Sequence, residues 1–405
     1  MNILIVTTRI PYPPYRGDKL RMFNIATQLS KNNSVTIITL LRNKKQFEEI
    51  EELKKLNFKV NYIKISLLES LLNIFKSIFT TSPFQVAFYK SKRMKNKVYE
   101  LSNSGNFDVV YYHLIRSAQY LSDSNYKSAV LNVIDFTDAI SLYLSRFYEI
   151  EKNPIKKILL GIEKKRVEKY EHIAENFHSV FICSEIDRDY LKQIGIKANI
   201  KIIRNGINLD YFKPNDLEFE KNRILFTGNM PYYANYDAAI YFVKEIFPLV
   251  LREVPEAKFY IVGQNPPFRI RSLATENIIV TGFVKDIREE YLKSVVNVAP
   301  MRFGAGTSNK INESLILGVP VIATPLAVEG FPPEIKEMIY VPSNSKEFAD
   351  QVIRFLKFPM LREQFMKRDK SRIKEILNSG SIVKELEIYL KDELKKETNP
   401  IRPPL

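Results

Sequence analysis

The sequence is poor in cysteine, which limits the sites it can build. Its 405 residues contain a single cysteine, Cys183. One cysteine cannot form an internal disulfide or a zinc site with several thiolate ligands, and it is compatible with a reducing cytosol. We therefore expect neither a disulfide framework nor a multi-cysteine metal centre.

Long apolar runs are also missing. No stretch of 18 residues is both apolar and uncharged, so no membrane-spanning helix is expected. The first residues, MNILIVTTRIPYPPY, have no basic flank and only a four-residue apolar run, which predicts a first β-strand rather than a signal peptide. A hydrophobic content of 45% and a charged content of 26% are typical of a globular protein. The length predicts two domains of about 150 to 200 residues each.

Acidic residues are too few to balance the basic ones. The 61 lysines and arginines exceed the 46 acids, which gives a formal net charge of +15. No zinc-finger or RNP-type signature is present, and the basic residues are not interleaved with aromatics, so a nucleic-acid partner is not expected. A membrane surface or an anionic lipid-linked substrate is the partner that this charge favours.

The most informative stretch lies between residues 299 and 330. A glycine-rich loop, residues 304–307, follows a strand-like run and leads into a predicted helix over 308–317, which Gly318 ends. A second strand-like run follows at 319–323. Such a strand, loop and helix unit presents backbone N–H groups at a positive helix end, which suits a phosphate.

Two charged residues of that predicted helix fit a nucleotide. Lys310 lies in the first turn and can reach the same anion, and Glu313 follows one turn later on the same face. A cation for a diphosphate and a carboxylate for ribose hydroxyls form one interpretation. The other is an ordinary crossover whose lysine and glutamate form a solvated pair.

The first half of the chain has the pattern of a doubly wound domain. A strand at 2–8, a proline-rich loop at 9–16, a helix at about 19–31 and a strand at 35–40 form its opening. Gly17 follows the loop, where it serves either a close approach to substrate or a simple turn.

Three further strands end at polar residues on the side where such folds build sites, namely His113, Asp135 and Ser184. Asp187 and Asp189 have the spacing of a carboxylate metal pair. Because Ser184 precedes them as a helix N-cap, we assign these acids to the first helical turn and predict no metal site.

A domain boundary is predicted at the Asn205-Gly206 turn, after which strand patterns restart at 223–229, 258–263 and 277–282. The fold class predicted is α/β, with two doubly wound Rossmann-like domains. The first covers residues 1–206 and the second 207–377. A C-terminal helix at about 378–397 is long enough to return to the first domain.

Residues 67–79 form a strongly amphipathic pattern beside basic residues at 90–97, and a second basic cluster lies at 152–166. An apolar helix face beside basic clusters is how a peripheral protein binds an anionic membrane surface. A helix packed on the core with a solvated basic neighbour explains the same pattern.

The chain resembles GT-B glycosyltransferases of the retaining family 4, and within it the exopolysaccharide-associated subgroup with a Gly-x-Gly-Thr-x-x-Lys loop. The resemblance spans most of the chain. The motifs that carry it are the 11–17 loop, His113, residues 204–207 with Phe212 and Pro214, 226–228, 261–263, 281–284 and 302–330.

The resemblance implies an acceptor-binding N-terminal domain and a donor-binding C-terminal domain with a cleft between them. It assigns the diphosphate to Lys310 and to the loop of Gly304, Gly306 and Thr307. It assigns the ribose to Glu313, and it places Gly228 in the donor site. The base would lie at Gly282, Phe283 and Val284, the donor sugar at His113, both substrates near Gly17, and the sugar or phosphate at Glu329.

Two departures from the family pattern concern catalysis. The family commonly has two glutamates eight positions apart, but Ala305 stands where the first would be. A basic pair is also absent from residues 230–237. The remaining cations for the leaving diphosphate are Lys310 and Arg302, together with the loop N–H groups.

The sequence therefore predicts a retaining, metal-independent glycosyltransferase of the hexosyltransferase type that needs no cofactor. Its expected substrates are a nucleotide-sugar donor and a glycan or lipid-linked acceptor in cell-surface polysaccharide biosynthesis. The expected location is cytoplasmic, at the inner face of the cell membrane. The alternatives are a catalytically silent glycan- or nucleotide-binding partner and a nucleotide-sugar epimerase, for which the three histidines supply no acid–histidine pair.

Overall fold

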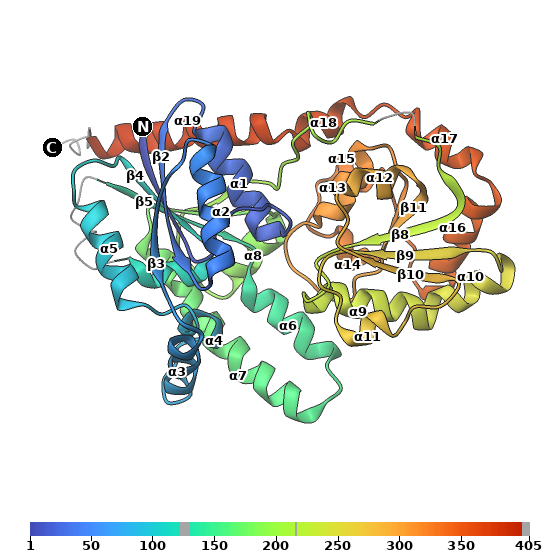
Figure 1. The fold of residues 1–405 in the computed structure, drawn as a ribbon, viewed down its shortest axis with the longest axis horizontal. Coiled ribbons are helices and arrows are strands. Elements are labelled where there is room, and N and C mark those ends of the chain that lie inside the picture. The colour runs from blue at the N-terminus through green and yellow to red at the C-terminus, as the bar shows by residue number, and fades with distance from the viewer. Residues whose placement is uncertain (122–129, 215–216, 399–405) are drawn as a thin grey trace. The chain divides into compact units, whose positions relative to one another are not determined.

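The computed structural model describes residues 1–121, 130–214 and 217–398, and the chain divides into two compact units (Figure 1). Unit 1 contains Met1–Arg204 together with the chain from Ser379 on, and unit 2 contains Asn205–Asn378. The division between the units falls two residues before the predicted one.

Unit 1 is built on a seven-stranded parallel sheet with the order β3-β2-β1-β4-β5-β6-β7. The chain moves outward from β1 in one direction, returns to its other side and then moves outward again, so the order reverses between β1 and β4. Its strands are β1 (Asn2–Thr7), β2 (Ser34–Leu41), β3 (Lys59–Lys64), β4 (Val109–His113), β5 (Leu131–Thr137), β6 (Ser179–Ile182) and β7 (Ile200–Ile202).

The central strand shows why the sheet has helices on both faces. Alternate residues of β1 belong to separate hydrophobic cores, with Ile3 and Ile5 in one and Leu4 and Val6 in the other. A parallel strand that is buried on both sides reads as a continuous apolar run, which is the pattern of NILIVT.

The helices of unit 1 differ from the prediction mainly at their ends. The first begins at Gly17, two residues earlier than expected. Those before β5 are α1 (Gly17–Leu29), α2 (Lys44–Lys55), α3 (Leu67–Ser77), α4 (Phe84–Ala87), α5 (Lys92–Ser102) and η1 (Ile115–Tyr120). Those after it are α6 (Ile140–Ile150), α7 (Pro154–Glu171), η3 (His172–Asn176), α8 (Glu185–Gln193) and α19 (Ser379–Thr398).

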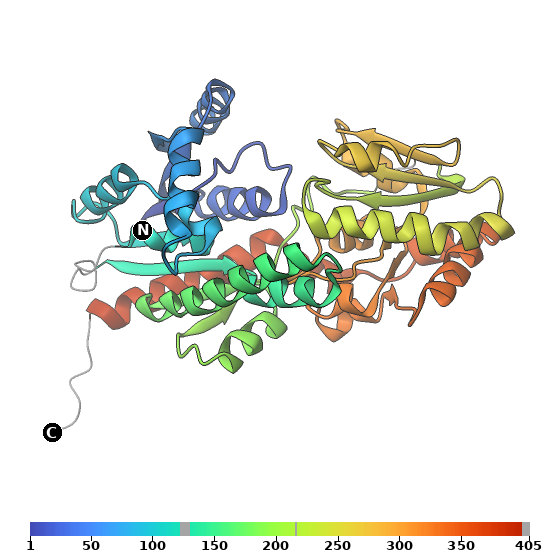
Figure 2. The same ribbon diagram turned by 90° about the horizontal axis from the view of Figure 1, so that it is seen from below.

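The C-terminal helix α19 lies along unit 1 and contacts α1 (Figures 1 and 2). Its residues Val383, Leu386 and Leu390 are buried in the same core as Ile25 and Leu29 of α1. The predicted return of this helix to the first domain is therefore confirmed.

Unit 2 is a six-stranded parallel sheet with the order β10-β9-β8-β11-β12-β13, and its order reverses between β8 and β11. Its strands are β8 (Glu220–Thr227), β9 (Lys258–Val262), β10 (Ile278–Gly282), β11 (Ser294–Ala299), β12 (Val321–Ala323) and β13 (Ile339–Tyr340). The prediction of two doubly wound α/β domains is confirmed.

The helices of unit 2 include one interruption that the sequence pattern did not indicate. The helical segment between β8 and β9 consists of α9 (Tyr233–Tyr241), a π-helical turn η4 (Phe242–Ile246) and α10 (Phe247–Glu253), with a proline in the first turn of α10. The others are α11 (Phe268–Arg271), α12 (Ile287–Leu292), α13 (Asn309–Ile316), α14 (Pro325–Val328), α15 (Pro333–Lys336), α16 (Ser345–Lys357), α17 (Met360–Met366) and α18 (Ser371–Leu377).

A buried ion pair joins α1 to the sheet of unit 1. Arg21 donates from Nε to Asp135 Oδ2 at 2.7 Å and from Nη2 to Oδ1 at 3.2 Å. The Tyr111 hydroxyl donates to the same carboxylate at 2.8 Å, and a further N–H of Arg21 reaches the carbonyl of Arg204 at 3.3 Å. Burial alone would raise the pKa of Asp135, but Arg21 outweighs it and lowers that pKa. Asp135, singled out at a strand end, therefore stabilises the fold.

We expect Asp135→Asn to lower the free energy of unfolding by about 3–5 kcal/mol, because it leaves the Arg21 charge buried without its partner. The contribution of Asp135 is present above its ordinary pKa of about 3.9 and is lost as the pH falls through its lower folded-state pKa. The difference in unfolding free energy between wild type and variant should therefore shrink in acid. Urea unfolding at neutral and at strongly acidic pH measures it.

The control is Asp189→Asn, which removes an exposed carboxylate that pairs with its neighbour Arg188. Such surface pairs contribute about 0–1 kcal/mol. A stability of Asp135→Asn equal to that of this control would show that the buried pair does not hold α1 on the sheet.

Candidate active site

The carboxyl edge of the unit 2 sheet brings the predicted donor residues into one region, because all of its strands are parallel and end there. Gly228 follows β8, Gly282 ends β10, and the 304–307 loop follows β11. Ligands of such sheets bind at this edge, next to the point where the strand order reverses.

Two glycines let the ends of β8 and β9 come together. A Cβ on Gly263 would lie 1.7 Å from the carbonyl oxygen of Gly228, which no side chain can tolerate. A Cβ on Gly228 would lie 2.7 Å from the side chain of Asn235, in the first turns of α9. Gly228 therefore allows Asn235 to pack directly against the end of β8.

The glycine-rich loop runs from the end of β11 to the first turn of α13. Gly306 has a φ of +69°, in the left-handed region that favours glycine. Thr307 accepts a hydrogen bond at 3.1 Å from the side-chain amide of Asn205, which attaches the loop to the first residue of unit 2. Gly318 ends α13 with a φ of +72°, as predicted for a helix-terminating glycine.

Lys310 is buried in the first turn of α13, with 7% of its surface exposed. Its ammonium group donates to Asn235 Oδ1 at 2.7 Å, lies 3.7 Å from the sulfur of Met301 and stands 4.6 Å from the ring centroid of Phe226. All three partners are neutral. Burial lowers the pKa of Lys310 to about 7, and the nearby Glu313 opposes that shift.

Asn235 is fixed in the orientation that presents its oxygen to Lys310. Its Nδ2 donates to the carbonyl of Asn229 at 3.1 Å, which leaves Oδ1 for the ammonium group. Because Lys310 has a positioned but uncharged acceptor, its charge is held in place without being neutralised. An anion brought to this position would gain most from it, since the interaction occurs in a low-dielectric site.

Arg302 is arranged differently. Its guanidinium group forms two hydrogen bonds to Asp237 on α9, one of them at 2.9 Å from Nε to Oδ2, and lies 5.1 Å from the ring centroid of Tyr241. Its charge is therefore already balanced by a carboxylate. Of the two cations that the sequence left for the diphosphate, Lys310 is the one that forms no ion pair with a carboxylate among the described residues.

Glu313 lies one turn after Lys310 and belongs to a chain of hydroxyl groups. Its Oε2 accepts from the Tyr291 hydroxyl at 2.8 Å, and that hydroxyl lies 2.7 Å from Thr227 Oγ1. Burial raises the pKa of Glu313 to about 7, against the opposing effects of Tyr291 and Lys310. The solvated lysine–glutamate pair of the alternative interpretation does not fit, because Lys310 is buried and donates to Asn235, while the half-buried Glu313 accepts from Tyr291.

The remaining donor-side residues surround the same edge. Gly282 has a φ of +74°, and Phe283 directly after it is exposed, with Val284 half-buried. On the other side, Leu326 of α14 lies 4.0 Å from where a Cβ of Gly304 would stand. Glu329 directly follows that helix.

In unit 1, His113 ends β4 and is fully enclosed. Its Nδ1 lies 3.3 Å from Thr7 Oγ1, and the Thr7 hydroxyl donates to the carbonyl of Arg9 at 3.0 Å. The Thr7 oxygen must therefore accept from Nδ1–H, which leaves Nε2 as a bare acceptor. Within the described structure Nε2 has no hydrogen-bond partner. Burial lowers the pKa of His113 to about 4, so this imidazole is neutral near pH 7.

Gly17 is the exposed first residue of α1, beside the reversal point of the unit 1 sheet. The next residue, Asp18, pairs with Arg9 at 2.6 Å and with Arg116 at 3.4 Å. His113, Gly17 and these charged residues thus share the carboxyl edge of β1 and β4.

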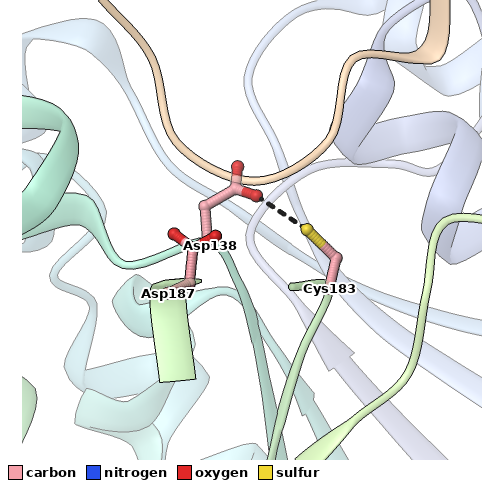
Figure 3. A group of neighbouring side chains, drawn as sticks. All are labelled: Asp138, Cys183 and Asp187. Atoms are coloured by element: carbon pink, nitrogen blue, oxygen red, sulfur yellow. Dashed lines mark hydrogen bonds between the residues drawn. The ribbon is translucent and has the colours of Figure 1, made fainter. Parts of the chain in front are cut away.

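Asp138, Cys183 and Asp187 form a third group, in which one ligand atom from each lies within 4.8 Å of the others (Figure 3). The Cys183 thiol donates to Asp138 at 3.2 Å, and burial and Asp187 raise the pKa of Asp138 to about 8. Both carboxylate oxygens of Asp187 accept hydrogen bonds, from the Ala139 N–H and the Ser184 hydroxyl.

The Asp138 carboxyl holds a proton near neutral pH, and both carboxylate oxygens of Asp187 already accept hydrogen bonds. Ser184 accepts from the Asp187 N–H at 3.2 Å, so it is the helix N-cap that the sequence predicted. Asp189 pairs instead with Arg188 at 2.8 Å and is exposed. We therefore build no metal site on these acids.

Several residues of these sites were not singled out from the sequence. Asn235 and Asp237 lie in the stretch that lacks the family's basic pair, and Tyr291 belongs to none of the motifs. Asn235 lies 75 positions from Lys310 and Asp237 lies 65 from Arg302, so no local spacing connects them.

Comparison with known proteins places part of the chain in a described family. Residues 221–357, which contain Lys310 and Glu313, match the family described as "Glycosyl transferases group 1". A Klebsiella pneumoniae protein described as "Uncharacterized 44.6 kDa protein in cps region" is 22% identical over 378 residues, covering 88% of this chain and 91% of that protein.

Solved structures share the whole fold at low sequence identity. Sucrose-phosphate synthase from Thermosynechococcus elongatus superposes with a TM-score of 0.70 at 15% identity and covers 98% of this chain and 99% of its own. Anabaena HepE in complex with UDP-glucose gives a TM-score of 0.69 at 13% identity, with 97% and 100% covered. The fold and the matched domain together confirm the expectation of a GT-B glycosyltransferase.

Proposed function

We propose that the protein transfers a sugar from a nucleotide-diphosphate-sugar to a glycan or lipid-linked acceptor in cell-surface polysaccharide synthesis. The observation that carries this proposal is the buried Lys310, held by neutral groups beside a glycine-rich loop within the matched domain. A diphosphate at this place would supply the negative charge that the ammonium group lacks.

The chemistry would consist of positioning and anion stabilisation. As the bond between the anomeric carbon and the diphosphate oxygen breaks, negative charge develops on the leaving phosphate next to Lys310 and the loop N–H groups. The acceptor oxygen bonds to the same carbon from the same face, and its proton passes to the leaving phosphate. This would be the retaining, metal-independent reaction that the resemblance to family 4 implies. The bare Nε2 of His113 would accept a hydrogen bond from a hydroxyl of the donor sugar.

The assignment of the remaining donor contacts follows the same edge. Glu313 would bind the ribose hydroxyls, with Tyr291 holding its carboxylate, and exposed Phe283 would stack on the base. The neutralised Arg302 would position α9, and hence Asn235, instead of contacting the leaving group. The similarity to a protein from a cps region supports a role in surface polysaccharide synthesis.

We also propose that the protein binds the surface of an anionic membrane through α3. Its buried residues are Ser70 and Ser77, whereas seven apolar side chains in and directly after it are 50–78% exposed. These are Leu67, Leu68, Leu71, Leu72, Phe75, Ile78 and Phe79. The apolar side chains of α3 are thus exposed, against the core-packing interpretation. Figure 1 shows α3 projecting from the rest of unit 1.

Charge near this face fits a peripheral contact. Lys76, Lys90, Lys92 and Lys95 are exposed, and Ile155, Ile158, Leu159 and Ile162 form a second exposed apolar group on α7. Arg166 of α7 donates to the carbonyl of Ile78, which ties the two elements together. None of the described helices is long and apolar enough to cross a bilayer. Binding would therefore rest on α3 and on basic residues at the cytoplasmic face of the membrane.

We expect Lys310→Ala to weaken nucleotide binding and to lower turnover by about 10²–10³-fold, the usual effect of removing one group that stabilises a developing anion. Thermal shifts with UDP, GDP, ADP and their sugars should show one nucleotide that stabilises the wild type and not the variant. The control is Lys346→Ala, an exposed lysine on α16. If no nucleotide stabilises the wild type, the catalytically silent binding partner becomes the better interpretation.

The affinity for that nucleotide should fall as the pH rises above about 7. Free Lys310 keeps its proton below this pH and loses it above, whereas a bound diphosphate favours the charged form, so binding must take up a proton. Calorimetric titration between about pH 7 and pH 8.5 checks this range. In Lys310→Met the change of affinity with pH should vanish. A pH dependence that survives in this variant would assign the proton to another group.

Charging the exposed face of α3 should abolish membrane binding. We expect Leu71→Glu with Phe75→Glu to remove co-sedimentation with vesicles rich in anionic lipid, because both side chains would enter the acyl boundary. The matched control is Ile388→Glu with Phe358→Glu, which charges two exposed apolar residues elsewhere. Wild type that fails to sediment, or a double variant that sediments equally well, would remove this proposal.

A further inference from the structure

Four arginines gather at the carboxyl edge of the unit 1 sheet, apart from the donor residues of unit 2. We call Arg9, Arg16, Arg42 and Arg116 the arginine cluster. Arg9 follows β1, Arg42 directly follows β2, and Arg116 lies in η1 after β4. These three strands are adjacent, in the order β2-β1-β4, and the strand order reverses between β1 and β4. The cluster therefore occupies the place where doubly wound sheets bind ligands.

Three members of the cluster converge on one aromatic ring. The guanidinium carbons of Arg42, Arg116 and Arg9 lie 4.6, 4.9 and 5.8 Å from the ring centroid of Tyr89. Arg9 also donates from Nε to the Tyr89 hydroxyl at 2.9 Å. Burial would raise the pKa of this tyrosine, but the three arginines outweigh it and lower that pKa. Like charges are thus held close together, which costs free energy unless an anion joins them.

Within the described ranges, the cluster has one carboxylate for four cations. Asp18 pairs with Arg9 at 2.6 Å and with Arg16 and Arg116 at 3.4 Å. Burial would raise the pKa of Asp18, yet these arginines hold it well below its usual range. Among the described residues, Arg42 has no carboxylate within ion-pair distance. A net charge of about +3 therefore remains, since arginine does not lose its proton in proteins.

The cluster also has hydrogen-bond donors that the described residues do not satisfy. Nη2 of Arg42 and Nε of Arg116 are buried and have no acceptor in the described structure. Arg116 is 12% exposed at its side chain, and burial together with Arg9 lowers its pKa to about 10. A buried guanidinium N–H without an acceptor is costly, so these groups are arranged for a ligand that brings oxygen atoms.

We propose that the arginine cluster binds a phosphate group of the acceptor, so that the acceptor substrate is a phosphate ester or a diphosphate. This rests on the proposed function, in which unit 1 receives the acceptor. A phosphate offers several oxygens and up to two charges, which match the net charge and the fork geometry of arginine donors. Asp18 and His113 lie beside Arg116, so the bound phosphate would hold the acceptor next to the proposed sugar contact.

The test is binding of phosphate compounds to the full-length protein. Thermal shift and calorimetry would use inorganic phosphate, glucose 1-phosphate and geranyl diphosphate, with glucuronate as a carboxylate probe. The background is Lys310→Ala, so that the donor site does not contribute. We expect Arg42→Gln to weaken binding of a phosphate compound by about 10–100-fold, the loss of one charged hydrogen-bonding partner.

Arg42 is the suitable position because it pairs with no carboxylate in the described part of the chain, so its removal leaves no acid there unpaired. Arg42→Lys keeps the charge and loses the fork, and should give an intermediate loss. The matched control is Lys31→Gln, an exposed lysine just after the C-terminal end of α1, which should bind as wild type does. Unchanged binding in Arg42→Gln, or stronger binding of glucuronate than of every phosphate compound, would overturn the proposal.

The probes also distinguish the source of the phosphate. Binding of geranyl diphosphate alone indicates a lipid-linked diphosphate, whereas equal binding of glucose 1-phosphate indicates a phosphorylated sugar. Failure of the proposed function appears elsewhere, as loss of the nucleotide shift that depends on Lys310. In turnover measured with Lys310 intact, Arg42→Gln should raise KM for the phosphorylated acceptor and leave KM for the donor unchanged. A change confined to the donor KM would contradict the assignment.

Discussion

In a parallel sheet every strand must end at the same edge, because each crossover returns the chain to the opposite one. This constraint decides where both units of the protein place their reactive side chains. In unit 1 it aligns Thr7, His113 and Asp135 across three neighbouring strands. In unit 2 it brings residues from the ends of β8, β10 and β11 together although the sequence separates them widely. The doubly wound strand order adds a second condition. A ligand binds at this edge at the point where the strand order reverses.

What each group does at that edge depends on how its charge is compensated. Arg21 is fully paired by Asp135, and its role is to hold α1 on the sheet. Lys310 is as deeply buried but has an amide, a sulfur and an aromatic ring as neighbours, so its charge remains available. The arginine cluster lies between these cases, with one carboxylate shared by three of its four members. The degree of burial does not distinguish the roles of Arg21, Lys310 and the arginine cluster. The identity of their neighbouring groups does.

Local sequence patterns were sufficient to predict the strands, helices and loops but not the long-range contacts between their side chains. The strands, the helix-ending Gly318 and the glycine-rich loop could be predicted because a few adjacent residues encode them. The contact between Lys310 and Asn235 could not, because it depends on Gly228 allowing α9 to approach β8. Likewise, the arginines follow three separate strands, and only the strand order brings them together. For α3 the periodicity identified an amphipathic helix, but the same pattern fits a face turned inward or outward, and the buried Ser70 and Ser77 show which.

The place of α19 in the sequence has a consequence for biosynthesis. This helix completes the core of unit 1 through Val383, Leu386 and Leu390, yet the ribosome makes it after the whole of unit 2. At about 5–20 residues per second, the apolar face of α1 waits on the order of ten seconds or more for its cover. Unit 2 is contiguous and can fold as soon as it has left the ribosome. The core of unit 1 can therefore be completed only after unit 2 has been synthesised, and the apolar residues that α19 covers lack that cover during the interval.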